Sequence, residues 1–213
     1  TPTPLYEPHP LYEPHPLYEP HPLYEPHGYP NRNPVAYIGE PPCRNEKLGS
    51  LRPVVAIMDT GVGVHPWLTG VVNETVTLDG TPIGYTDPAT DPEQNPDQEG
   101  PLDGGLDASS GHGTFIAGLI HQACPDADII SWRLIPSEGP LAESEVMATL
   151  AQVLELVTRY FDGRTDGQRI DVLSLSYGFF HESAADTASE LQLRTMLRAL
   201  SVMGTVVVCA AGN

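Results

Sequence analysis

The chain has 213 residues, of which 28 are Asp or Glu and only 10 are Lys or Arg, so its formal net charge at pH 7 is −18. This excess of negative charge repels phosphate backbones and anionic lipid surfaces, which excludes nucleic acid and membrane surfaces as expected partners. The apolar runs, such as residues 205–211, are far too short to cross a bilayer. We therefore expect a soluble chain that holds one domain of ordinary size at most.

A proline-rich repeat occupies the front of the chain. Residues 5–28 read Leu-Tyr-Glu-Pro-His-Pro three times and then Leu-Tyr-Glu-Pro-His-Gly. Because prolines at this density prevent helices and sheet ladders, we expect a disordered, extended spacer rich in polyproline II. We interpret residues 1–34 as this tail, residues 35–52 as an irregular lead-in and residues 53–213 as the folded domain.

From residue 53 onward, apolar runs alternate with segments of helical periodicity. Four runs have strand character: residues 54–58, 128–135, 170–175 and 205–211. The first and the last are continuous apolar runs, which are typical of strands buried on both faces. Apolar residues at helical spacing mark three further segments: residues 112–123, 146–163 and 193–203. Strands separated by such helices pair in parallel, so the sequence predicts a doubly wound α/β fold with a mostly parallel sheet.

An acidic stretch, residues 79–111, interrupts this alternation and shows no clear periodicity. Seven acidic residues follow Asp79 in this stretch, among many glycines and prolines: Asp87, Asp91, Glu93, Asp97, Glu99, Asp103 and Asp107. A loop of this length is usually functional or disordered. Carboxylates are ligands for calcium, yet the spacing is not that of an EF-hand. We interpret the stretch as a solvated acidic loop and expect no cofactor and no metal, with calcium as the alternative.

The three cysteines are widely separated, which argues against a disulfide framework. Cys209 lies in a valine-rich run, where we expect it to pack as a small apolar residue. A bond between Cys43 and Cys124 stays open.

Three polar side chains stand at the positions where a parallel α/β sheet collects its functional groups. Asp59 and Asn213 each follow an expected strand, and His112 lies between two glycines at the start of an expected helix. Functional groups in such sheets gather beyond the carboxyl ends of the strands. A carboxylate, an imidazole and a carboxamide are the groups that orient, deprotonate and stabilise during acyl transfer to a serine.

Four motifs in this order resemble the first part of a subtilisin-like serine protease catalytic domain, over residues 53–213. The aspartate motif is Val-Val-Ala-Ile-Met-Asp-Thr-Gly at 54–61, and the histidine motif is Ser-Gly-His-Gly-Thr-Phe-Ile-Ala-Gly at 110–118. Asp-Val-Leu-Ser-Leu-Ser-Tyr-Gly at 171–178 resembles the substrate-binding strand, and Val-Cys-Ala-Ala-Gly-Asn at 208–213 resembles the strand that ends in the oxyanion-hole asparagine. Each motif alone is weak, but four in the right order are specific.

The resemblance implies a role for each polar residue. His112 would take a proton from a serine hydroxyl and return it to the leaving amine, while Asp59 would fix the tautomer of its ring. Asn213 would donate its side-chain amide to the oxyanion. The implied substrate-binding residues form an edge to which an extended peptide adds as a strand: Ser176, Tyr177 and Gly178.

One part of the family pattern has no match. The family's nucleophile lies in a Gly-Thr-Ser-Met-Ala-type segment, and no such segment occurs in residues 1–213. We therefore expect the N-terminal portion of a catalytic domain: the full-length product is a serine endopeptidase, and this fragment is inactive. The resemblance implies peptide or protein substrates and suggests an extracellular location, and we expect a monomer.

Two other functions stay open. The first is a non-catalytic, peptide-binding remnant of a protease, which an early stop codon after residue 213 would favour. The second is an aspartic protease, because Asp-Thr-Gly is also the motif of that class. Aspartic proteases need two such aspartates within a β-rich fold, and Asp-Thr-Gly occurs once here.

Overall fold

The computed structural model describes residues 41–100, 105–137, 141–176, 178 and 187–210. The chain divides into two units, Thr1–Tyr37 and Ile38–Asn213, and all described elements belong to the second. The hexad repeat and the extended form predicted for it lie outside the described residues, so that prediction stays untested.

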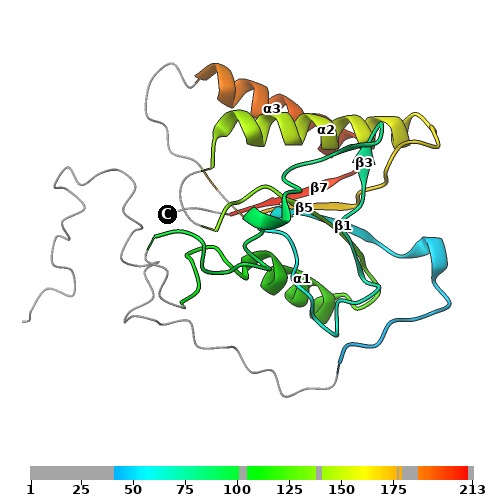
Figure 1. Ribbon diagram of the computed structural model, residues 1–213. Coiled ribbons are helices and arrows are strands. Elements are labelled where there is room, and N and C mark those ends of the chain that lie inside the picture. Colours follow the sequence, from blue (N-terminus) through cyan, green and yellow to red (C-terminus); the bar gives the residue numbers. More distant parts are fainter. Residues whose placement is uncertain (1–40, 101–104, 138–140, 177, 179–186, 211–213) are drawn as a thin grey trace, which may run out of the picture. The chain divides into compact units, whose positions relative to one another are not determined.

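A five-stranded sheet with the order β2-β5-β1-β6-β7 forms the centre of the second unit (Figure 1). All its neighbouring strands are parallel. The strands are β1 (Val54–Asp59), β2 (Val72–Asn73), β5 (Asp128–Arg133), β6 (Val172–Leu175) and β7 (Val206–Cys209). The parallel sheet was predicted because its strands alternate with helices along the chain.

Helices cover both faces of this sheet. Helix α1 (His112–Ala123) lies on one side, and α2 (Glu143–Phe161) and α3 (Thr187–Val202) lie on the other (Figure 1). Successive residues of β1 serve the two cores in turn: Ile57 packs in the α1 core, and Met58 in the core that α2 and α3 cover. This alternation follows from the pleat of a strand. The predicted doubly wound α/β fold is confirmed.

The last strand differs from its prediction. We expected residues 205–211 to form a strand buried on both faces, but β7 is an edge strand, and Val206 and Val208 are 58% and 50% exposed. Cys209 is exposed instead of packing as an apolar residue. The prediction of burial is wrong for the described residues, because among them β7 has a neighbouring strand on one side only, and an apolar run indicates strand character but not the position of the strand in the sheet.

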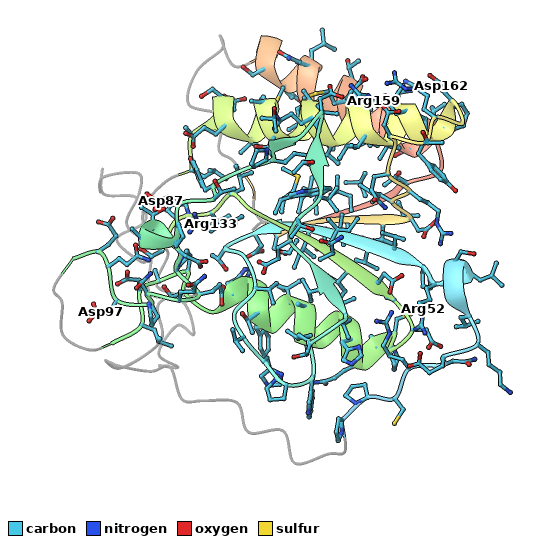
Figure 2. The ribbon with its side chains drawn as sticks, turned by 45° about the vertical axis from the view of Figure 1, so that its right-hand side comes forward. Arg52, Asp87, Asp97, Arg133, Arg159 and Asp162 are labelled. Atoms are coloured by element: carbon cyan, nitrogen blue, oxygen red, sulfur yellow. The ribbon has the colours of Figure 1, made fainter. Side chains whose placement is uncertain are left out.

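A short hairpin accounts for part of the stretch that showed no periodicity. Strands β3 (Thr77–Leu78) and β4 (Thr81–Pro82) pair antiparallel around Asp79 and Gly80, which both have positive φ angles. Asp-Gly is the residue pair that such a tight turn favours. Arg159 of α2, labelled in Figure 2, donates to both carboxylate oxygens of Asp79, at 2.5 and 2.8 Å, and so connects the hairpin to the helix.

The described structure also bears on the cysteines and on membrane crossing. Cys43, Cys124 and Cys209 are all free thiols, so the open question of a Cys43–Cys124 bond is answered in the negative. Among the described helices, none combines the length and the apolar character that a membrane crossing requires.

Candidate active site

Asp59 ends the central strand β1, at the point where the chain leaves the sheet. Its neighbours in β1 are buried, and Asp59 itself is only 1% exposed. A buried carboxylate needs donors to offset its lost hydration. The backbone N–H of Thr60 supplies one, at 2.8 Å from Oδ1. Gly61 then turns the chain sharply, with a φ of 100° that only glycine adopts without strain.

His112 is the first residue of α1, as the sequence predicts. Its ring Nδ1 lies 2.8 Å from Oδ1 of Asp59, across 53 residues of sequence. Because a deprotonated carboxylate only accepts, Nδ1 carries the proton in this contact. The ring's other nitrogen, Nε2, is thereby left as the acceptor in the neutral imidazole. The side chain of His112 is 44% exposed, so a substrate group has access to it.

The charge of Asp59 changes the acidity of His112. The hydrogen bond to Asp59 raises the pKa of His112 above its ordinary value of 6.5, although partial burial of the ring acts in the opposite direction. The carboxylates of Asp59 and Glu93 add to this increase through their charges. An imidazole with this environment accepts a proton more readily than a solvated one.

Backbone N–H groups and threonine hydroxyls connect the segments that carry Asp59 and His112. Gly113 N–H donates to Oγ1 of Thr60 at 2.8 Å, and Gly63 N–H donates to Oγ1 of Thr114 at 2.6 Å. A Cβ at Gly113 would lie 2.1 Å from the carbonyl oxygen of Gly61, so any side chain there would push the two segments apart. The glycine after His112 therefore sets how close α1 comes to the end of β1.

Glu93, which we expected to lie in a solvated loop, is a part of this site. Its carboxylate accepts from the hydroxyls of both Thr60 and Thr114. Thr60 comes one residue after Asp59, and Thr114 two residues after His112. The signal in the sequence is therefore a pair of hydroxyls, one beside each site residue, that can share one acceptor. The start of the loop is fixed by Arg133, which donates to the carbonyl oxygens of Tyr85 and Asp87 (Figure 2).

The acidic loop is thus less solvated than expected. Asp107 is 7% exposed, and its Oδ2 accepts from the backbone N–H groups of Gln98 and Glu99. The interpretation of the whole stretch as solvated is wrong for Asp107 and for Glu93, because local donors draw their carboxylates inward. Within the described ranges, no group of three or more His, Cys, Asp or Glu side chains is placed to hold a metal ion.

The predicted substrate edge follows β6, the neighbour of β1. Ser176 comes directly after this strand, and a Cβ placed at Gly178 would meet no atom within 4 Å among the residues that the structure describes. Leu175 pairs with Cys209, which brings the carboxyl ends of β6 and β7 together at the edge where β1 ends. Tyr177 and Asn213 lie outside the described residues, so their predicted roles are not tested.

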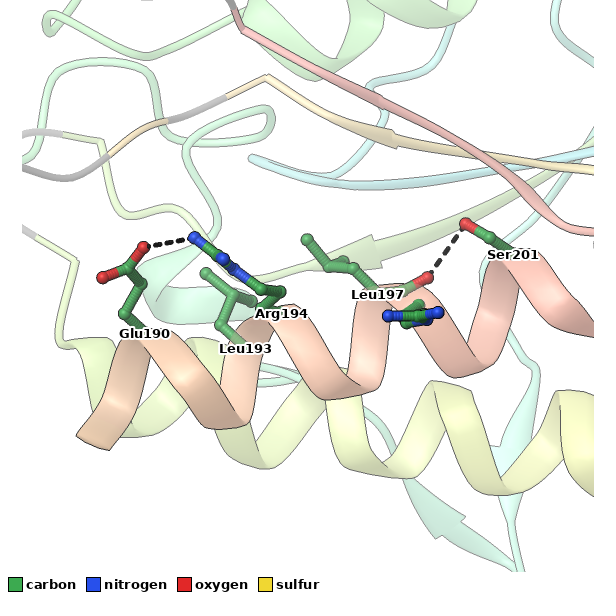
Figure 3. Close-up of a pocket in the computed structure, with 6 residues that line it drawn as sticks. Glu190, Leu193, Arg194, Leu197 and Ser201 are labelled. Atoms are coloured by element: carbon green, nitrogen blue, oxygen red, sulfur yellow. Dashed lines mark hydrogen bonds and ion pairs between the residues drawn. The ribbon is translucent and has the colours of Figure 1, made fainter. Parts of the chain in front are cut away.

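A separate hollow lies along the outer helix α3, on the other face of the sheet from α1 (Figures 1 and 3). It is lined by Glu190, Leu193, Arg194, Leu197, Arg198 and Ser201. Glu190 and Arg194 are paired with each other at 2.8 Å. None of the predicted site residues contributes to this hollow.

Comparison with known proteins agrees with the motifs. The sequence model of the subtilase family, Peptidase S8, matches residues 52–213. The chain therefore belongs to the subtilase family, a family of serine peptidases, and the resemblance seen in the sequence is confirmed.

A solved structure and the curated proteins complete this comparison. The chain is similar to a protein described as a cold adapted subtilisin-like serine proteinase, at 20% sequence identity and a TM-score of 0.45. The match covers 75% of this chain and 46% of that one, so this chain spans less than half the length of the solved relative. No curated protein matches the chain.

The close approach at Gly113 predicts the effect of a single methyl group. Gly113→Ala should lower the midpoint of urea unfolding and should weaken the contact between His112 and Asp59, because the new Cβ meets backbone that cannot rotate away. Gly118→Ala is the matched control, since it lies in the same helix and its added Cβ would meet no described atom beyond the neighbouring backbone of that helix. That control should gain about 0.5–1 kcal/mol from helix propensity. Equal effects of the two substitutions would contradict the packing described here.

The hydrogen bond to Asp59 predicts how His112 titrates. Because the folded pKa is raised, this contact stabilises the fold fully below about pH 6.5, and the stabilisation is lost as the pH rises through the folded pKa. Asp59→Asn should move the titration of His112 to lower pH, as followed by NMR of its ring protons. Asp162→Asn removes the same charge from an exposed position after α2 and should leave that titration unchanged. An unaltered His112 titration in Asp59→Asn would contradict the assignment.

Proposed function

We propose that the full-length protein is a serine endopeptidase in which Asp59 and His112 are two members of the catalytic triad. The observation that carries this proposal is the 2.8 Å contact between the buried carboxylate of Asp59 and Nδ1 of His112. Membership in the subtilase family supports it, because the family's members are serine peptidases. The nucleophilic serine would come from a segment that is not among residues 1–213.

The contact between Asp59 and His112 supports a role for each of these two groups. Asp59 holds the proton on Nδ1 of His112, so that Nε2 is free to take the proton of the serine hydroxyl as the serine oxygen attacks the peptide carbonyl. The imidazolium that forms is stabilised by Asp59, and it then protonates the leaving amine, which breaks the peptide bond. Water then attacks the acyl-enzyme: His112 takes a proton from the water and gives it to the serine oxygen as the acyl group leaves as a carboxylic acid. Asn213 would donate to the oxyanion in both halves of the reaction.

The proposed substrate is an extended peptide that adds to the edge formed by Ser176, Tyr177 and Gly178. Backbone hydrogen bonds would hold such a peptide as an additional strand, whatever its side chains. The space beside Gly178 supports this placement, because none of the described residues occupies the position that a substrate side chain would need. The parallel sheet with helices on both faces differs from the β-rich fold of an aspartic protease, so that alternative has no support in the structure.

The experiment is active-site labelling of the protein expressed from the complete coding sequence. A fluorophosphonate probe should label the unchanged protein, and His112→Ala should lower the labelling rate by about 10³-fold or more, because the serine loses its base. His65→Ala, which removes an exposed imidazole after the aspartate motif, should label at the original rate. Labelling of His112→Ala at the original rate would overturn the proposal. No labelling of a full-length protein that lacks a Gly-Thr-Ser segment would also overturn it, and would favour the peptide-binding remnant.

A further inference from the structure

A single carboxylate joins the two segments that carry Asp59 and His112. Glu93 Oε2 accepts from the hydroxyl of Thr114 at 2.5 Å, and Oε1 accepts from the hydroxyl of Thr60. Thr60 follows Asp59 at the end of β1, and Thr114 lies in the first turn of α1. Glu93 itself comes from the acidic loop, so three separate parts of the chain meet at its side chain.

The number of protons at Thr60 fixes the direction of these bonds. Its hydroxyl accepts from Gly113 N–H and has one proton to donate. Two carboxylate oxygens lie within reach of that proton: Oδ1 of Asp59 at 3.3 Å and the closer Oε1 of Glu93. The shorter contact to a charged acceptor is the stronger one, so the Thr60 hydroxyl donates to Glu93.

This direction matters for Asp59. With the Thr60 hydroxyl turned to Glu93, Oδ1 of Asp59 accepts from two close donors, Thr60 N–H and His112 Nδ1–H, each at 2.8 Å. Without Glu93, the Thr60 hydroxyl would be free to turn to Oδ1 of Asp59, which lies 3.3 Å away. A third donor at that oxygen would draw electron density from the bond to His112 and weaken it.

The charge of Glu93, like its hydrogen bonds, favours the interaction between Asp59 and His112. The imidazolium of His112 is stabilised by two carboxylates, Asp59 from β1 and Glu93 from the loop. Glu93 also interacts through its charge with Glu74 after β2, and Glu74 in turn interacts with Asp91 of the same loop and with Arg133 at the end of β5. Arg133 is bound to loop carbonyls and lies 3.9 Å from Asp91, so it partly offsets the negative charge of this group.

From these contacts we propose that Glu93 is a positioning residue of the active site: its carboxylate binds the hydroxyls of Thr60 and Thr114 and so keeps Asp59 available to His112. The catalytic importance of this role rests on the proposed function, but the contact itself does not. Glu93 acts through the two threonines and touches neither substrate nor the reacting atoms.

The first experiment measures the His112 ring in this chain by ¹⁵N and ¹H NMR. Glu93→Ala should speed solvent exchange of the Nδ1 proton and move the His112 titration to lower pH. Glu93→Gln keeps the shape and an acceptor oxygen but removes the charge, so it should also move the titration to lower pH while it slows exchange relative to Glu93→Ala. Glu99→Gln, which removes one charge from an exposed position in the same loop, should change neither value.

The outcomes separate positioning from mere stability. Unchanged His112 exchange and titration in folded Glu93→Ala would overturn the proposal. If Glu93→Ala does not fold, then Glu93→Gln decides: a His112 titration equal to that of the unchanged chain would overturn the proposal. The amide signals of β1 and α2 serve as the check of folding.

The second experiment uses the full-length enzyme. Glu93→Ala should lower kcat by about 10- to 100-fold and leave KM unchanged, because the base is misplaced while the peptide edge stays intact. A rise in KM without a change in kcat would contradict a positioning role. If the unchanged full-length protein has no activity while the NMR effects appear, the proposed function fails and the positioning contact stands. If activity is present and the NMR effects are absent, only the role of Glu93 fails.

Discussion

The structure depends on how one buried carboxylate is satisfied. Asp59 lies at the end of a strand that is covered on both faces, and it is 1% exposed. An unpaired charge in such a place would cost far more than the fold could tolerate. Thr60 N–H and His112 Nδ1 both donate to its Oδ1, so the requirement is met only when α1 begins beside the end of β1. The hydrogen bond that satisfies the Asp59 carboxylate is therefore the same bond that orients the His112 ring.

The parallel sheet brings Asp59 and His112 to the same region, and contacts from the loops fix the distance between them. Parallel strands bring their carboxyl ends to one edge, so β1, β6 and β7 all deliver the chain toward the same region. Gly113 permits backbone contact with Gly61, and Glu93 then joins the two segments from a third direction. Arg133, which stands opposite Asp59 in the register of β1 and β5, holds the start of the loop that contains Glu93.

Much of this could be predicted from the sequence, since the strands and helices have clear apolar periodicities and the motifs around Asp59 and His112 are specific in their order. The start of α1 at His112 and the parallel pairing followed from those patterns. The edge position of β7 did not, because an apolar run looks alike in the middle and at the side of a sheet. The role of Glu93 did not either, because nothing in the local pattern of an acidic loop tells which carboxylate meets distant hydroxyl donors.

The tautomer of His112 is the sharpest test of the contact between Asp59 and His112. A neutral histidine in water carries its proton mainly on Nε2, and only a strong acceptor at Nδ1 reverses that preference. ¹⁵N chemical shifts of the His112 ring, recorded above its pKa, distinguish the two forms without any need for a nucleophile or a substrate. If Asp59 holds the ring as described, Nδ1 is protonated and Nε2 is not. A ring that carries its proton on Nε2 would contradict this arrangement.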